Sequence, residues 1–151
     1  VPQISAYQAK IGGPLMDRID LQLDVRRLPP GSVLDSGTGT DSATLREGVL
    51  RAREFAAWRR AREGGGEGAQ AGAGRRRAAT RPCEVIASCG LDDAARGFIE
   101  SMARAYALSG RALLSMLNVA RTIADIEERQ AVREDHIAEA LGLRLRDGIG
   151  R

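Results

Sequence analysis

The C-terminal part of the chain carries three successive helical patterns of apolar residues, which limit the fold more than any other feature of the sequence. Apolar residues recur at steps of three and four, a spacing that places them on one face of a helix. The three patterns cover residues 91–106, about 110–127 and about 134–142. Ser109 is suited to begin the second helix and Gly142 to end the third. We therefore predict a small bundle of short amphipathic helices.

Composition supports a helical core. Hydrophobic residues make up 43% of the 151 residues, but aromatic residues make up only 3%. A core built from Leu, Ile, Val and Ala suits packed helices better than a β-sandwich, which usually uses aromatic and β-branched residues. The fold class that we expect is mainly α, and the length predicts about one domain.

A fourth helix is expected upstream, from about Ala43 to Arg62. Asp41 or Ser42 can cap it, because a short side-chain oxygen can accept an amide of the first turn. Its apolar stripe consists of Leu45, Val49, Ala52 and Ala56. Residues 46–62 are also rich in arginine.

One strand is expected near the N-terminus. Apolar and polar residues alternate from Ile19 to Arg26, which is the period of a half-buried strand. Pro29, Pro30 and Gly31 end it. Because one strand cannot form a sheet and the chain starts at Val1 rather than Met, we expect this segment to be the end of a larger α/β core.

Residues 63–74 are low in complexity and rich in glycine, which predicts a flexible linker. Four arginines follow, within residues 75–81. The net charge of +3 and the pI near 9.4 are too mild to prove a nucleic-acid partner. The arginines at 46–62 and 75–81 offer cations to DNA phosphates, but a solvated helix face and a basic linker explain them equally well.

No metal or membrane site is expected from the sequence. Cys83 and Cys89 do not have the spacing of a zinc site, and His136 is far away. No apolar run approaches the ~18 residues needed to span a bilayer, and the N-terminus lacks a signal-peptide core. We therefore expect a cytoplasmic protein.

No motif in the chain can run a reaction unaided. The glycine-rich stretch at residues 37–42 lacks the lysine of a P-loop. Arg18, at a turn before the expected strand, and Arg111, in the first turn of a helix, are nevertheless candidate phosphate-binding residues. A helix N-terminus favours anions, and an arginine there adds a planar donor. On the residue pattern alone, a solvated or salt-bridged role remains open for each.

Four motifs, taken together, resemble the ComM/YifB-type proteins, which are AAA+ ATPases related to the ATPase subunit of magnesium chelatase. Residues 7–21 (YQAKIGGPLMDRIDL) resemble the family's K-I-S-G-P-L-L-D-R-I-D run. Residues 108–127 (LSGRALLSMLNVARTIADIE) resemble its L-S-x-R…R-V-A-R-T-I-A-D-L-E helix. Residues 89–92 (CGLD) and 135–141 (DHIAEAL) resemble its C-x-L-D and E-H-x-x-E-A-L motifs. The matches follow the family's order.

The resemblance implies roles for two residues. Arg18 matches the arginine finger, which reaches the ATP of the neighbouring subunit, and Arg111 matches the sensor-2 arginine of the helical lid. ATP and Mg²⁺ are the implied cofactors of the intact protein. We expect none to bind to this chain alone, and no hydrolysis by it, because Walker A, Walker B and sensor 1 lie upstream in the family. Arg121 and the stripe from Thr122 to Asp125 are expected to be structural, pairing along or between helices.

The resemblance also implies an organisation and a function. Residues 1–30 would end the AAA+ core, 31–62 would form a connecting loop and basic helix, 63–82 a linker, and 83–151 the helical lid. The intact protein is expected to form a homo-oligomeric ring, a hexamer, that drives DNA branch migration in natural transformation. Two alternatives remain: a magnesium-chelatase-like subunit that remodels a protein partner, and a helical interaction module without a nucleotide role.

Overall fold

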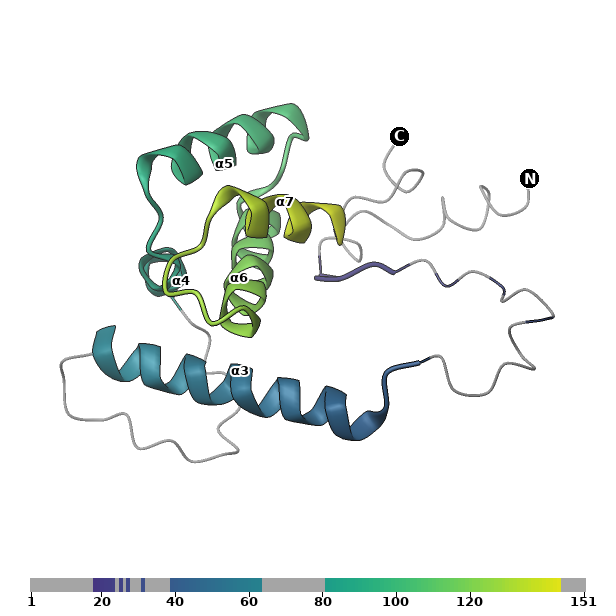
Figure 1. Ribbon diagram of the computed structural model, residues 1–151. Helices are drawn as coiled ribbons and strands as arrows, with labels where there is room; N and C mark the ends of the chain where they lie inside the picture. Colours follow the sequence, from purple (N-terminus) through teal and green to yellow (C-terminus); the bar gives the residue numbers. More distant parts are fainter. Residues whose placement is uncertain are drawn as a thin grey trace.

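The computed structural model describes residues 18–23, 25, 27, 31, 39–63 and 81–144. Within these residues the chain forms five helices, which Figure 1 shows: α3 (Ser42–Glu63), α4 (Pro82–Cys89), α5 (Asp93–Ala105), α6 (Gly110–Ile126) and α7 (Glu134–Gly142). The mainly helical class predicted from the sequence is confirmed. Of the segment 63–82, predicted to be a linker, residues 64–80 lie outside the described residues, while residue 63 ends α3 and residue 82 begins α4.

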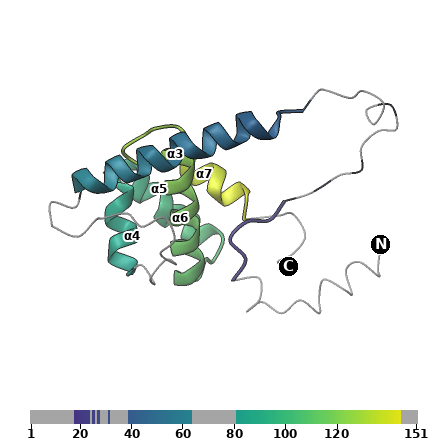
Figure 2. The ribbon, with the colours of Figure 1, turned by 90° about the horizontal axis from the view of Figure 1, so that it is seen from below.

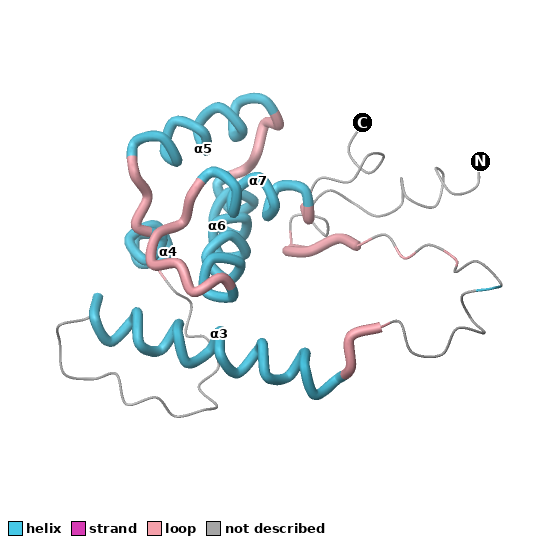
Figure 3. The backbone as a smooth tube through the Cα atoms, viewed as in Figure 1, coloured by secondary structure: helices cyan, strands magenta, loops and turns pink. Residues whose placement is uncertain are grey.

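Helix α6 is the centre of the bundle. It packs against α3, α4 and α7, and α5 packs against α7. Figure 3 shows α6 passing between α4 and α7, with α3 crossing below its end. The largest fully buried side chains lie around it: Met116, Ile137, His136, Val132 and Cys89. Among the described residues no Phe, Tyr or Trp is buried, and the core consists mainly of Ala, Val, Ile and Leu, as the low aromatic content predicts.

Short side chains cap three of the described helices, α3, α5 and α6. The Asp41 carboxylate accepts the amide of Thr44 at 2.8 Å, so Asp41, the first of the two expected candidates, caps α3. The Ser109 hydroxyl accepts the amide of Ala112 at 3.1 Å and caps α6, as predicted. Asp92 does the same for α5 through the amide of Ala95, at 2.8 Å. Each cap satisfies a backbone donor that has no partner inside its helix.

Helix α4 was not predicted from the sequence. It has only eight residues and begins with Pro82, which is tolerated in a first turn because proline lacks an amide hydrogen there. Gly90 ends it with a φ of +56°. In this left-handed conformation a residue with a Cβ is strained. The carbonyl of Cys89 accepts the amide of Val132 at 2.7 Å, which fastens the loop before α7 to the end of α4.

The strand expected from Ile19 is not formed in the described residues. Residues 19–23 belong to no helix or strand. The amide of Gln22 donates a hydrogen bond to the carbonyl of Leu143 at 2.8 Å, just after the end of α7. A strand requires a second strand beside it, and the described part of the chain is otherwise helices and their connections. The alternation of apolar and polar residues is real, but Leu21 and Leu23 are half exposed or more.

Helix α3 buries less of its apolar stripe than we expected. Leu45 and Val49 are 59% and 50% exposed, whereas Ala56 and Arg59 are buried. The reason is that α3 meets α6 through its C-terminal half, and Figures 1 and 2 show its other half extending past the bundle. None of the described helices combines the length and apolar character that crossing a bilayer requires.

Candidate functional site

Arg111 is exposed at the beginning of α6. It is the second residue of the helix, directly after the Ser109 cap and Gly110. Among the described residues it has no ion-pair partner. The helix dipole disfavours a cation in this first turn by about 0.3–1 kcal/mol. Arg111 therefore slightly lowers the stability of the folded protein. An anion at this position would be attracted both by the helix dipole and by the guanidinium.

Arg18 is also exposed, in a turn just before residues 19–23. Arg18 forms no ion pair with any of the described residues. The residues that follow it are anchored to the bundle. The guanidinium Nη1 of Arg144 donates to the carbonyl of Ile19 at 3.2 Å, and Ser115 forms a hydrogen bond with the carboxylate of Asp20. Ser115 lies on α6, one helical turn after Arg111.

The two candidate arginines are thus connected to the same end of one helix. Arg111 belongs to α6, and Arg18 precedes a segment that hydrogen-bonds to α6 through Ser115. Residues four apart on a helix share a face, so Ser115 and Arg111 lie on the same side of α6. The structure brings the segment carrying Arg18 to the face that carries Arg111.

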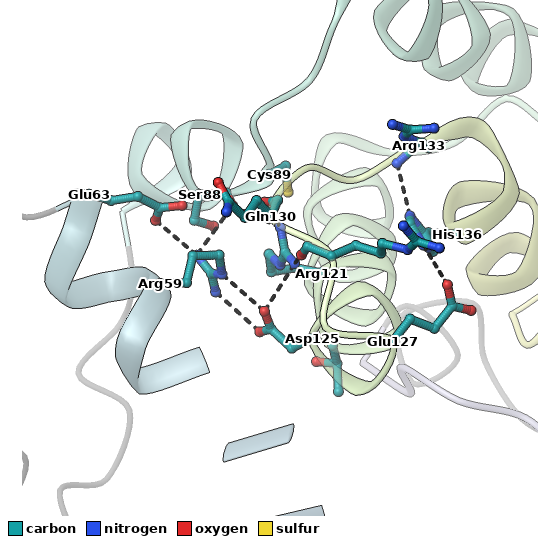
Figure 4. Close-up of polar contacts among 12 residues, drawn as sticks. Arg59, Glu63, Ser88, Cys89, Arg121, Asp125, Glu127, Gln130, Arg133 and His136 are labelled. Carbon is teal, nitrogen blue, oxygen red and sulfur yellow. Dashed lines mark hydrogen bonds and ion pairs between the residues drawn. The ribbon is translucent and has the colours of Figure 1, made fainter. Parts of the chain in front are cut away.

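A second group of charged side chains lies near the other end of α6, and we call it the arginine cluster: Arg59, Arg121 and Asp125. Arg59 reaches from α3 and is 4% exposed. Its Nε and Nη2 donate to the two carboxylate oxygens of Asp125 at 2.9 and 3.1 Å, a bidentate pair (Figure 4). Glu63, one turn further along α3, accepts a third bond from Arg59 at 2.8 Å.

Arg121 approaches Asp125 from within α6. Its Nη2 lies 3.0 Å from the Oδ1 of Asp125, four residues later. The same guanidinium donates to the carbonyl of Gln130 at 2.7 Å and to the carbonyl of Arg129. A longer bond of 3.4 Å reaches the carbonyl of Ser88 at the end of α4. Arg121 therefore ties α4 and the loop after α6 to α6, and its predicted structural role is confirmed.

The shared carboxylate affects the two arginines differently. Burial disfavours the charged form of Arg59, but the hydrogen bonds and charges of Asp125 and Glu63 outweigh burial and raise its pKa. Burial lowers the pKa of Arg121, an effect that Asp125 opposes and the positive charge of Arg59 reinforces. Both remain cations at neutral pH, because a guanidinium loses its proton only far above it. The two buried cations thus share the Asp125 carboxylate, while Arg59 also pairs with Glu63 and Arg121 also bonds to backbone carbonyls.

A cleft of about 740 Å³ lies beside the arginine cluster, between α3, α4 and α6. Besides the cluster, its polar lining includes Asn118 and Thr122, whose side chains donate to the carbonyls of Leu114 and Asn118 at 3.1 and 2.8 Å. These groups hydrogen-bond along their own helix.

His136 is a buried polar residue whose structural role the sequence did not reveal. The amide of Arg133 donates to its Nδ1 at 2.9 Å, and its Nε2 lies 3.1 Å from a carboxylate oxygen of Glu127 (Figure 4). Because Nδ1 accepts, the proton of the neutral ring belongs on Nε2, where it points to Glu127. His136 therefore joins the first turn of α7 to the loop that follows α6.

The exposed arginines of α3 remain available for contacts with a partner. They are Arg46, Arg51, Arg53, Arg60 and Arg62. Arg62 lies over the ring of Trp58, with its guanidinium carbon 5.1 Å from the ring centroid. Arg59 is the exception in this basic stretch, because it is turned inward. Of the second basic patch, the structure describes Arg81, which is exposed.

Family comparisons agree with this architecture. Residues 39–144 match the family described as magnesium chelatase, subunit ChlI C-terminal, and residues 1–33 match that described as magnesium chelatase, subunit ChlI. The chain belongs to the magnesium chelatase ChlI family. The first of these matches includes α3 as well as α4 to α7.

Within this family the chain is of the ComM/YifB type. It is 37% identical over 143 residues to competence protein ComM of Haemophilus influenzae, covering 94% of this chain and 26% of that protein. It is 30% identical over 148 residues to the uncharacterized protein YifB of Escherichia coli, covering 97% of this chain and 27% of that protein. The chain therefore spans about a quarter of the length of these relatives, and the family resemblance inferred from the motifs is confirmed.

Proposed function

We propose that this chain supplies two arginines to ATP hydrolysis by an AAA+ ring ATPase of the ComM type. Arg18 acts as the arginine finger toward the nucleotide of the neighbouring subunit, and Arg111 as the sensor-2 arginine. In this proposal residues 1–30 end the ATPase core and residues 83–151 form the lid. Hydrolysis belongs to the intact protein, because these 151 residues contain no Walker A sequence.

The position of Arg111 carries the proposal. It is an exposed arginine in the first turn of a helix, where a cation is disfavoured unless an anion is bound. Phosphate oxygens fit this place, because a planar guanidinium donates two parallel hydrogen bonds and the helix end favours negative charge. Arg18 is exposed too and belongs to a segment bonded to the same helix, which supports a shared task for both residues.

The two residues differ in what they contribute. ATP, with Mg²⁺, supplies the phosphoryl group whose transfer to water releases the energy that such a ring uses. Arg111 binds phosphate oxygens and reports to the lid whether a nucleotide is present. Arg18 offers a permanently charged donor to the charge that develops on the phosphoryl oxygens, an effect worth ~10³–10⁵ in rate.

We further propose that the intact protein is a cytoplasmic homo-oligomer, a hexameric ring, that drives DNA branch migration in natural transformation. The similarity to a competence protein supports this. The exposed arginines of α3 support it as well, because cations near DNA phosphates give affinity that does not depend on sequence.

A second candidate function is the remodelling of a protein partner for metal insertion, which the match to the chelatase subunit favours. The sequence upstream of Val1 in the gene separates the two candidates. A Lon-protease-like domain before the ATPase core indicates the ComM type, whereas a direct start at the core indicates a chelatase subunit.

The proposal is tested by ATPase assays on the intact protein. Arg18→Ala should lower hydrolysis about 10³-fold or more, to a residual rate that a long assay still measures, while nucleotide binding largely survives. Arg111→Ala should slow turnover about tenfold or more, which corresponds to ~1.4 kcal/mol. Arg104→Ala, at an arginine whose side chain is 77% exposed on α5, is the matched control and should behave like wild type. Normal turnover in Arg111→Ala would instead support a helical interaction module without a nucleotide role.

Mixing subunits tests whether Arg18 acts across the interface. A Walker-defective subunit still carries Arg18, and an Arg18→Ala subunit still carries an intact nucleotide site. A mixture of the two should recover part of the ATPase activity, because the finger of one completes the site of the other. If the mixture stays inactive, the assignment of Arg18 to the neighbouring nucleotide is wrong.

A further inference from the structure

Arg144 is a buried arginine to which the sequence analysis assigned no role. It is the second residue after the end of α7 and is 7% exposed. Its Nη1 donates to the carbonyl of Ile19 at 3.2 Å and to the hydroxyl of Ser115 at 3.3 Å. One guanidinium thus contacts both the segment after Arg18 and the helix that carries Arg111.

Two further bonds complete this contact, which we call the N-terminal joint: Ile19, Asp20, Gln22, Ser115, Leu143 and Arg144. Ser115 forms a hydrogen bond with the carboxylate of Asp20. A hydroxyl can donate one hydrogen bond while accepting another, so Ser115 can give its proton to Asp20 and accept from Arg144. The amide of Gln22 donates to the carbonyl of Leu143 at 2.8 Å.

The joint determines where Arg18 can be. Residues 19–23 form no helix or strand, so regular backbone pairing does not hold them. Their contacts with α6 and with the end of α7 start one residue after Arg18. Burying a guanidinium is expensive unless its donors are satisfied. Arg144 is buried at this point, although an arginine exposed to solvent would avoid the cost of desolvation.

We propose that Arg144 is a positioning residue for Arg18: it couples the segment that carries Arg18 to α6, so that the two candidate arginines move as one body. Arg144 itself touches no nucleotide in this role. The inference rests on the proposed function of Arg18, because positioning matters only if Arg18 acts on a nucleotide. It goes beyond that function in naming the group that transmits movements of the lid to the finger.

The first test is kinetic and uses the intact protein. Arg144→Ala should lower kcat for ATP hydrolysis at least tenfold and leave KM for ATP within about twofold, because a displaced finger affects turnover and not binding. Arg144→Lys should recover part of kcat, since an ammonium can donate to the same oxygens. Ser115→Ala is a milder second variant that removes the hydroxyl but no charge, and Arg104→Ala is the control.

A double variant separates positioning from a general loss of structure. Arg18→Ala combined with Arg144→Ala should be no slower than Arg18→Ala alone, because residues acting through one another are not additive. A purely structural role predicts that the two losses multiply. Wild-type kcat in Arg144→Ala, or multiplying losses in the double variant, would overturn the positioning role.

The second test follows the joint directly, by hydrogen exchange of this chain. The amide of Gln22 should exchange markedly faster in Arg144→Ala and in Ser115→Ala than in Arg104→Ala, while α6 keeps its protection. Unchanged exchange at Gln22 would overturn the coupling even if ATPase activity fell. If Arg18→Ala hydrolyses ATP normally, the proposed function fails, and the positioning role with it. If Arg18→Ala is inactive but Arg144→Ala is normal, only the positioning role fails.

Discussion

The two ends of α6 use the same side chain in opposite ways. Arg111, at the start of the helix, is exposed, and among the described residues it has no ion pair. Arg121, near the end, is 5% exposed and bonds to Asp125 and to backbone carbonyls. An arginine that holds the bundle together is bonded to acceptors from several segments, whereas Arg111 forms no ion pair with the described residues. The environment, and not the residue type, distinguishes the two arginines.

The strongest way to test this comparison is to remove the shared carboxylate. Asp125→Asn leaves Arg121 as a buried cation without a counter-charge, and leaves Arg59 with Glu63 as its remaining carboxylate partner. We expect the free energy of unfolding to fall by about 3 kcal/mol or more, as is usual when one partner of a buried ion pair is lost. Urea denaturation followed by circular dichroism measures it.

The matched control for this variant is Glu100→Gln. Glu100 pairs with Arg104 at 3.7 Å, and both side chains are largely exposed. Exposed pairs of this kind contribute little, so the change should stay within about 0.5 kcal/mol. Equal losses in Asp125→Asn and Glu100→Gln would show that the arginine cluster is not a buried ion pair.

A smaller effect is expected from Arg59→Ala, which removes the contact of α3 with Asp125 but leaves Arg121 to neutralise that carboxylate. We expect a loss of about 2 kcal/mol, the range for hydrogen bonds to charged groups. Hydrogen exchange should show that α3 loses protection while α5 to α7 keep theirs. Arg60→Ala, at the exposed neighbour, is the control, and comparable loss of protection there would contradict the assignment.

At the start of α6, removing an arginine should stabilise the folded protein instead of destabilising it. Arg111→Ala removes a cation from the positive end of the helix dipole and should raise the free energy of unfolding by about 0.3 kcal/mol or more. Urea denaturation of this chain measures it, beside Arg121→Ala, which should be clearly destabilised. If Arg111→Ala lowers stability by 1 kcal/mol, then Arg111 is a structural arginine and the comparison between the two ends fails.

The smallest effect concerns the reactivity of the two cysteines of α4, of which one is buried and the other exposed. Burial raises the pKa of the Cys89 thiol, so its reactive thiolate forms only at higher pH than usual. Cys83 is exposed. At pH 8, iodoacetamide should therefore label Cys83 first, and labelling of Cys89 should increase as the pH rises further. Mass spectrometry of the two peptides measures this, and equal rates would indicate that α4 opens freely.

Much of the fold could be predicted from the sequence because it depends on neighbours along the chain. The helical spacing predicted α6 and α7 almost to the residue, and Ser109 marked the cap of α6. Helix α4 escaped prediction because eight residues give too short a pattern. The prediction of a strand from Ile19 was wrong, because alternating apolar and polar residues indicate only a half-buried segment. Forming a strand also requires a second strand beside it.

The arginine cluster was only partly predictable. Arg121 and Asp125 lie four residues apart on one helix, a spacing that indicates pairing. Arg59 continues the apolar stripe of α3 at the step after Ala56, and a charged residue in that position was a usable sign of burial. Arg144 gave no comparable sign, since its partner Ile19 is 125 residues away in the chain.

The sequence by itself determined α3, α5, α6 and α7, the caps of α3 and α6, and the family, because periodicity, capping side chains and motif order depend on consecutive residues. Only the tertiary structure decided which arginines are buried and which are exposed, and that the segment after Arg18 rests on α6. The physical reason is that a guanidinium is stable in the interior only where acceptors from distant segments converge on it, and that convergence exists only once the helices have packed.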